Sequence, residues 1–381
     1  MGGIYLHIPF CKQACYYCDF HFSTSLAKKT TMVNAIAKEL ELRKKEVSEP
    51  IETIYFGGGT PSILSIEELQ FLIKTIYDLF EVCDHPEITL EANPDDLVPQ
   101  MSSQEDSIFK QYRAIGINRL SIGIQSFFND DLKMMNRAHN ADEATRCLTE
   151  ATRFFDNITI DLIYGMPKMT NDKWVKNIEK ALSFGVPHIS SYALTVEPKT
   201  ALERFIKKGT ITAPQDDVAH EHFQLLVNTL TAHGFVHYEL SNFGKPNYFS
   251  KHNTSYWLGK SYIGVGPSAH SYNGKERAWN VANNVQYIKN IQSNTLAISR
   301  ETLSVQDCYN EYIMTGLRTI YGVSLQKIKS EFGQLVYQHL IKSSKKYIDQ
   351  QLLCVDDNKL LTTAQGKFLC DGIASDLFLI D

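Results

Sequence analysis

The sequence predicts an α/β fold with a parallel sheet, followed by a smaller terminal domain. From its start to about residue 195, the 381-residue chain alternates short β-branched runs with amphipathic stretches of helical period. The runs end in Gly, Pro or Asn, and the alternation occurs six times. Repeated strand, loop and helix units are typical of parallel βα folds. Six such units can close partway into a barrel or form a flat, doubly wound sheet, and the pattern does not choose between the two.

The elements of this first part follow in order along the chain. The predicted strands lie in "GIYLHIP", "IETIYFGGG", "EITLEANP", "INRLSIGIQS", "ITIDLIYGMP" and "HISSYALTVEP". The predicted helices between them include residues 32–47, 65–80, 142–155 and 172–184. Unusual polar or Gly-rich stretches follow the carboxyl ends of the strands. Because active sites of parallel βα folds lie on that edge, we expect a ligand site there.

The chain changes character after about residue 195. A helical stretch, "DDVAHEHFQLLVNTLTAHGF", leads to short strands and to an aromatic, Gly-rich segment. Beyond residue 300, three helical runs (307–319, 324–332 and 335–350) precede a strand pair that turns at 356–358, and a last helix follows. We therefore predict a main domain over residues 1–240 and a connecting segment over 241–300. Residues 301–381 are predicted to form a helical, winged-helix-like α+β domain.

Composition and charge exclude several classes of protein. The formal net charge of −5 argues against broad affinity for nucleic acid. The terminal 81 residues carry eight Lys or Arg against ten Asp or Glu, which favours a packing or interaction module over a DNA reader. The sequence contains no apolar run long enough to span a bilayer and no signal-peptide pattern, so we expect a cytoplasmic protein.

Three of the eight cysteines, Cys11, Cys15 and Cys18, lie within eight residues in "HIPFCKQACYYCDFHF". In a reducing compartment, such clustering favours metal binding or redox chemistry over disulfides. Zinc sites usually use four ligands from two pairs, and here His21 would have to complete a Cys3His set. Three thiolates alone would leave one iron of a cubane iron–sulfur cluster open to a small molecule. The other five cysteines are interpreted as small buried hydrophobes.

The C-x3-C-x2-C spacing resembles the hallmark of the radical S-adenosylmethionine (SAM) superfamily. "IYLHIPFCKQACYYCDF" is similar to the branch that contains oxygen-independent coproporphyrinogen III oxidase and the HemW heme chaperones. "YFGGGTPS", "LEANPDD", "RLSIGIQSFFNDDLKMMNRAH", "IDLIYGMP", "SYALTVEPKT" and "LTTAQGKFLCDGI" extend the resemblance over nearly the whole chain. The resemblance implies a partial (β/α)6 barrel of the radical SAM type. It also implies a [4Fe-4S] cluster on the three cysteines, with SAM on the free iron and reductive cleavage of SAM to a 5′-deoxyadenosyl radical.

The resemblance also implies which residues surround SAM. The glycines of "GGGTPS" let the backbone approach a ligand closely, and Gly58, Gly59 and Thr60 match the loop for the methionine end of SAM. Glu91 would accept hydrogen bonds from ribose hydroxyls or the ammonium group. The other positions that match SAM contacts are Tyr5, Tyr17, Gln125, Arg137, Asp161 and Ala193. An alternative for Arg137 and Asp161 is an ion pair across the barrel mouth.

A second motif, "HNTSYW", matches the HNxxYW motif associated with heme binding in HemW-like proteins. Its matched residues are His252, Asn253, Tyr256 and Trp257. An imidazole can ligate heme iron, and the two aromatic rings offer flat apolar surface to a porphyrin. Which residue ligates the iron stays open, because His237 and His270 are further candidates.

Two features favour the chaperone over the oxidase. Phe20 stands where oxidases usually have a fourth cysteine, and only three residues precede "IYLHIPF", where the oxidase has an N-terminal arm. We therefore expect a HemW-like heme chaperone without oxidase activity, which binds heme, receives electrons from a donor and serves apo-hemoproteins such as respiratory enzymes. The alternatives are the oxidase of porphyrin biosynthesis, another radical SAM enzyme and a zinc-binding structural protein. The oligomeric state stays open, with a homodimer among the alternatives.

Overall fold

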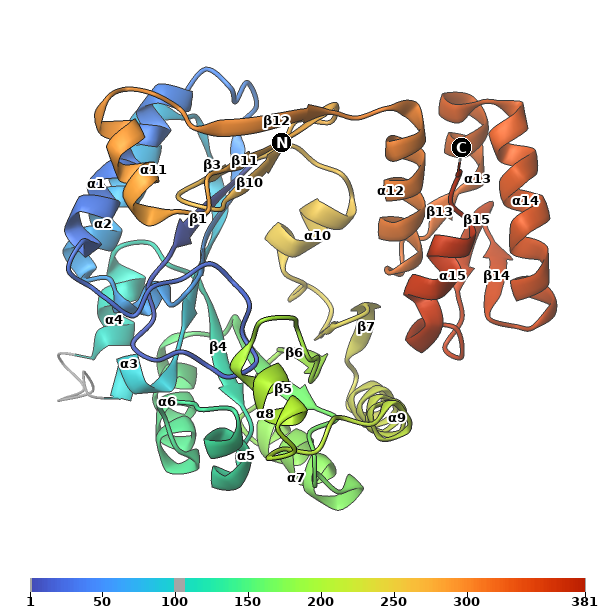
Figure 1. The fold of residues 1–381 in the computed structure, drawn as a ribbon, viewed down its shortest axis with the longest axis horizontal. Helices are drawn as coiled ribbons and strands as arrows, with labels where there is room; N and C mark the ends of the chain where they lie inside the picture. The colour runs from blue at the N-terminus through green and yellow to red at the C-terminus, as the bar shows by residue number, and fades with distance from the viewer. Residues whose placement is uncertain (1, 99–106, 381) are drawn as a thin grey trace.

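The computed structural model describes residues 2–98 and 107–380, and its main domain is built on six parallel strands (Figure 1). These are β1 (Gly2–Ile8), β2 (Ile51–Gly58), β3 (Val82–Ala92), β4 (Arg119–Gln125), β5 (Ile158–Tyr164) and β6 (His188–Ala193). Each strand pairs in parallel with the next one in this order. The predicted α/β fold with a parallel sheet is confirmed.

Helices cover the outer face of these strands (Figure 1). The long helices are α1 (Lys29–Arg43), α2 (Ile66–Leu79), α6 (Ala141–Phe154), α7 (Asn171–Leu182) and α9 (Asp216–Ala232). Short helices lie in the connecting segments: α3 (Pro94–Leu97), α4 (Ile108–Ala114), α5 (Asn129–Met134) and α8 (Ala201–Lys207). Capping boxes at Ser65 and Asn140 satisfy the first backbone N–H groups of α2 and α6. Every residue of β4 is buried, as expected for a parallel strand covered on both faces.

The sheet continues beyond both of its outer parallel strands. On the β6 side it adds β8 (Asn242–Gly244) and β7 (Val236–Glu239), and on the β1 side β9 (Tyr262–Val265), β10 (His270–Tyr272), β11 (Glu276–Asn280) and β12 (Ile298–Thr302). Strand β9 pairs in parallel with β1. Residues 241–300 therefore contribute five strands to the main sheet, together with α10 (Lys251–Trp257) and α11 (Asn284–Gln292). Such short strands carry little periodicity, and their partners are distant in sequence.

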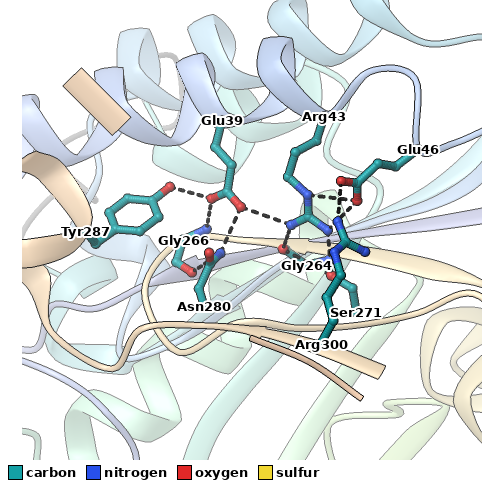
Figure 2. Close-up of polar contacts among 9 residues, drawn as sticks. All are labelled: Glu39, Arg43, Glu46, Gly264, Gly266, Ser271, Asn280, Tyr287 and Arg300. Atoms are coloured by element: carbon teal, nitrogen blue, oxygen red, sulfur yellow. Dashed lines mark hydrogen bonds and ion pairs between the residues drawn. The ribbon is translucent and has the colours of Figure 1, made fainter. Parts of the chain in front are cut away.

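A buried arginine fastens this added part of the sheet to α1 (Figure 2). Arg43 is 2% exposed, and its guanidinium donates to Glu39 Oε1 at 2.9 Å and to the backbone oxygen of Gly264 at 2.7 Å. It also donates to Ser271 Oγ at 3.0 Å and to Glu46 Oε2 at 2.9 Å. All the N–H groups of this guanidinium therefore have hydrogen-bond partners, and two of these partners belong to the β9–β10 region.

Glu39, one turn earlier on α1, completes the same network (Figure 2). Its carboxylate is fully buried and accepts hydrogen bonds from the backbone N–H of Gly266, from Asn280 Nδ2 and from the Tyr287 hydroxyl. A buried charge is tolerated only when it is paired and hydrogen-bonded. The network therefore fixes the β9–β11 strands and α11 on α1.

The terminal domain has its own hydrophobic core and a small antiparallel sheet. It consists of α12 (Val305–Leu317), α13 (Leu325–Lys327), α14 (Gln334–Asp349), α15 (Cys370–Asp376) and strands β13 (Val323–Ser324), β14 (Leu353–Asp356) and β15 (Lys359–Thr362). The N–H of Ile320 donates to the backbone oxygen of Tyr238, and Lys367 Nζ donates to that of His237. The predicted helical domain with a strand pair is confirmed, with β13 as a third strand. Within the described residues, no helix has the length and apolar character needed to cross a bilayer.

Removal of the buried negative charge of Glu39 should destabilise the main domain. We expect Glu39→Gln to lower the free energy of unfolding by about 3 kcal/mol, because the charge of Arg43 then lacks a buried partner. Urea denaturation followed by circular dichroism measures the change. The control is Lys38→Gln, which removes an exposed ion pair with Glu41 on the same helix and should have little effect. Equal effects of the two substitutions would contradict the role given to the network.

Candidate functional site

A cavity of about 480 Å³ lies at the carboxyl ends of the parallel strands. Most of the residues predicted to bind cofactors line it: Cys11, Cys15, Cys18, Tyr17, Gly58, Gly59, Thr60, Glu91, Gln125, Arg137, Asp161, Ala193 and Asn253. Tyr5, His252, Tyr256 and Trp257 are not part of its lining. The cavity thus gathers side chains from all six parallel strands or the loops that follow them, and one from α10.

The three cysteines lie on the long loop that follows β1. The loop is closed at its base, where Phe10 bridges to Ser23 and the N–H of Cys11 donates to the backbone oxygen of Ser23 at 3.1 Å. Burial raises the pKa of the Cys11 and Cys18 thiols to about 11, so both are protonated at neutral pH in the absence of a bound cation. Metal binding would therefore release protons from this loop.

The donor set fits an iron–sulfur cluster better than a single metal ion. In the described part of the chain, no three His, Cys, Asp or Glu side chains converge as ligands of one ion. Cysteines that hold a cubane bind three different irons, so their sulfurs need not converge on one point. All three cysteines line the same cavity, and Arg137 Nη1 lies 3.3 Å from Cys15 Sγ. Their placement is compatible with the cluster implied by the sequence.

The Gly-rich loop after β2 is packed directly against the strand that precedes the cysteines. The N–H of Gly59 donates to the backbone oxygen of Ile8 at 2.9 Å, and that of Thr60 donates to the oxygen of Phe10 at 2.7 Å. A Cβ on Gly59 would lie 2.6 Å from the backbone oxygen of Phe10. The glycine is therefore required by contact with the cysteine loop, in addition to any contact with a ligand. Thr60 Oγ1 also donates to Cys11 Sγ at 3.4 Å.

Glu91, at the end of β3, is held in place by two donors. The Tyr55 hydroxyl donates to Oε1 at 2.7 Å, and the N–H of Gly58 donates to Oε2 at 3.2 Å. Burial raises the pKa of Glu91 above its ordinary value, although both hydrogen bonds favour the ionised form. Sequence reasoning did not identify Tyr55, whose only signal was its place in the strand before the glycines.

Asp161 and Arg119 lie in the floor of the cavity. Burial, followed by the charge of Glu91, raises the pKa of Asp161 to about 7, while the positive charge of Arg119 lowers it in part. Ser121 Oγ donates to both carboxylate oxygens at 3.4 Å. Arg119 is 1% exposed and was also missed from the sequence, where an arginine inside the buried run "INRLSIG" was an available signal.

Arg137 is held beside the cysteine loop by contacts of its guanidinium group. Its guanidinium donates to Asn93 Oδ1 at 2.5 Å and to the backbone oxygen of Gly123 at 2.9 Å, in addition to its contact with Cys15. Gln125 ends β4 with a positive φ of 65°, which turns the chain at the cavity edge. Among the described residues, the alternative ion pair between Arg137 and Asp161 is not formed.

The HNxxYW motif forms α10, and His252 is buried behind the cavity. Its Nδ1 lies 2.7 Å from Thr53 Oγ1 and its Nε2 lies 2.6 Å from the Tyr256 hydroxyl, so both ring nitrogens are engaged. Its ring stacks on Tyr55 at 4.9 Å, and burial lowers its pKa to about 3. The imidazole is therefore neutral at physiological pH. Ligation of an iron by His252 would require one of these two hydrogen bonds to break.

The remaining predicted residues lie around this core. Tyr5 stacks on both Tyr55 and His252 and so supports the cavity wall from behind. Trp257 lies under the guanidinium of Arg318 from the terminal domain, 5.6 Å from its ring centroid. The two other histidine candidates differ in exposure. His237 is buried with Nε2 on the backbone oxygen of Leu240, and His270 is exposed.

Comparisons with known proteins identify the family of the chain. Residues 5–181 match the Radical SAM superfamily, and residues 303–369 match the HemN C-terminal domain. Over 382 residues, 98% of this chain and 94% of the relative, the chain is 33% identical to "Heme chaperone HemW" of Mycobacterium tuberculosis. It is also 33% identical to the protein of the same name in Bacillus subtilis, over 97% of each chain.

A solved structure has the same fold over nearly its whole length. It is the coproporphyrinogen III oxidase HemN of Escherichia coli, a radical SAM enzyme, with a TM-score of 0.84 over 99% of this chain and 90% of that one. The two are 23% identical, so this likeness concerns the fold alone. The fold is that of the radical SAM class. At the level of sequence, the chain belongs to the HemW family within the radical SAM superfamily.

The sequence predicts that Asp161 contacts SAM, and the raised pKa of this carboxyl then predicts how SAM affinity should depend on pH. A pKa of about 7 leaves this carboxyl largely protonated at about pH 6, and the ionised form is the better partner for a sulfonium cation and ribose hydroxyls. The dissociation constant for SAM should therefore fall as pH rises from about 6 to 7.5, approaching tenfold per unit below the pKa. Equilibrium dialysis of the reconstituted protein measures this, and Asp161→Asn should remove the dependence. A steep profile in the variant would contradict the assignment.

Proposed function

We propose that this protein is a heme chaperone that holds a [4Fe-4S] cluster, binds SAM beside it, and delivers heme to apo-hemoproteins. The observation that carries the proposal is the convergence of three cysteines, a Gly-rich loop and two raised-pKa carboxyl groups on one cavity, with the heme-associated motif packed directly behind it. The family membership supports the chaperone role, because the two bacterial relatives named above are heme chaperones.

Cys11, Cys15 and Cys18 would hold the cluster, and Arg137 would lie against one of its thiolates. A bound cluster supplies one electron for reductive cleavage of SAM, and an external donor would have to provide that electron. Gly58, Gly59 and Thr60 would face the methionine end of SAM, while Glu91 and Asp161 would accept hydrogen bonds from its hydroxyl or ammonium groups. Tyr5, Tyr17, Gln125 and Ala193 complete the proposed set, with Tyr5 acting through the residues it supports.

Heme would bind along α10, at the end of the helix where Trp257 meets Arg318 of the terminal domain. Tyr256 and Trp257 offer aromatic surface, and Asn253 connects the helix to the cavity. His252 is the motif's candidate iron ligand once it leaves Thr53 or Tyr256. The exposed His270 needs no such rearrangement. Clients in respiration would receive heme from this surface.

The cluster assignment predicts that substitution of one of the three cysteines removes the bound iron. Anaerobically reconstituted protein should be brown with a broad sulfur-to-iron absorbance, because thiolates transfer charge to iron. Cys15→Ala should lose most of the bound iron and this absorbance. Cys354→Ala, which removes a cysteine of β14 that is exposed and not buried as the sequence predicted, should keep both. Iron content and the electron paramagnetic resonance of the reduced protein measure the result. A colourless, zinc-loaded wild type would overturn the proposal.

Heme binding and oxidase activity separate the two principal candidates. Titration with heme should give a saturable Soret shift, and Trp257→Ala should weaken it because the flat apolar contact is lost. Incubation with coproporphyrinogen III, SAM and a reductant should yield no decarboxylated porphyrin by chromatography. Sustained turnover to protoporphyrinogen would instead establish the oxidase as the function. No Soret shift in the wild type would also refute the chaperone.

A further inference from the structure

Helix α10 contacts the cofactor cavity and the terminal domain at once. Asn253 lines the cavity, and Trp257, four residues later, lies under Arg318. Residues four apart share one face of a helix, so a single face extends from the cavity to the terminal domain. Arg318 is itself fixed by a bidentate pair with Asp371, at 2.8 and 2.7 Å. A shift of α10 would therefore change contacts both in the cavity and at the terminal domain.

A buried carboxylate on β3 holds the first turn of this helix. Glu87 is 5% exposed, and its two oxygens accept hydrogen bonds from the backbone N–H groups of Lys251 at 3.1 Å and His252 at 3.0 Å. These N–H groups have no partner within the helix, and negative charge is favoured at this end. Seven residues are too few for an isolated helix to be stable. The position of α10 thus depends strongly on Glu87.

Arg119 connects Glu87 to the cavity. Its Nε lies 4.0 Å from Glu87 Oε2 and, among the described residues, has no hydrogen-bond partner. Arg119 also lines the cavity, where its charge favours ionisation of Glu91 and Asp161. One buried guanidinium is therefore shared between the carboxylate that holds α10 and the carboxyl groups that face the cavity.

Tyr55 forms a second connection between the cavity and α10. Tyr55 donates its hydroxyl to Glu91 and stacks its ring on His252 of α10. A ligand that engages Glu91 would therefore act on a residue already in contact with the helix. The two connections approach α10 from β2 and from β3.

We propose that Glu87 is a positioning residue that makes the stability of α10 depend on whether the cofactor cavity is occupied. The proposal rests on the proposed function, with SAM as the ligand of the cavity and heme as the ligand of α10. When SAM engages Glu91 and Asp161, these groups compete less for Arg119, and the Arg119–Glu87 pair and the first turn of α10 are strengthened. Binding linkage then requires heme and SAM to change each other's affinity by the same factor.

Hydrogen exchange tests the first half of the proposal without heme. In anaerobically reconstituted wild-type protein, SAM should slow exchange in a peptide covering residues 249–258 by about fivefold or more. Glu87→Gln keeps the size of the side chain but removes the charge shared with Arg119, so SAM should no longer change this exchange. Equilibrium dialysis confirms that the variant still binds SAM. The control is Glu143→Gln, which alters the capping box of α6 and should retain the SAM effect.

Heme titration tests the second half. The dissociation constants for heme with and without SAM should differ by about fivefold or more in the wild type and in Glu143→Gln, and should coincide in Glu87→Gln. If Glu87→Gln misfolds, Glu87→Asp, which keeps the charge but shortens its reach, should give an intermediate ratio.

The outcomes distinguish this proposal from the function it rests on. A wild type that binds no heme would overturn the chaperone function, while the exchange experiment would still decide the role of Glu87. Equal exchange with and without SAM in the wild type would overturn the coupling. Faster exchange in Glu87→Gln with an unchanged SAM effect would show that Glu87 is merely structural, and would also overturn it.

Discussion

The parallel pairing of β1 with both β2 and β9 is the constraint on which the rest of the structure depends. This strand ends at the cysteine loop, and its neighbour β2 ends at the Gly-rich loop, so their register brings Gly59 against the backbone of Ile8 and Phe10. Its other neighbour, β9, is fastened to α1 by the buried Arg43 and Glu39. A shift of one residue in β1 would exchange its two faces and move the cysteines away from the cavity.

The cavity is also an electrostatic arrangement. Asp161 and Glu91 are both raised in pKa by burial and lie near each other, which disfavours two negative charges in one site. The positive charge of Arg119, in the floor of the cavity, offsets part of this repulsion. Two buried carboxyl groups beside one arginine would gain from a ligand that carries positive charge and hydroxyl groups, which are features of SAM.

The HNxxYW motif acquires a different physical meaning in the folded protein. In the sequence, the resemblance of "HNTSYW" to a heme-associated motif makes His252 a candidate ligand for heme iron. In the structure, its neutral ring is packed between the cavity wall and Tyr256, with both nitrogens engaged. The motif therefore contributes to the architecture that connects the cavity with α10 and the terminal domain, in addition to any contact with heme.

The sequence by itself determined the six parallel βα units, the helical terminal domain and the choice of edge for the cavity. These features are local: strand and helix periods are set by neighbouring residues, and the site edge follows from strand direction. The cysteine spacing and the other motifs also identified the family. Tertiary structure alone decided that residues 241–300 extend the main sheet, that Tyr55 and Arg119 line the cavity, and that Glu87 holds the first turn of α10. Their roles depend on partners far away along the chain, as when Tyr55 and Glu87 both contact His252, and strand pairing and buried charge between such distant residues leave no local pattern.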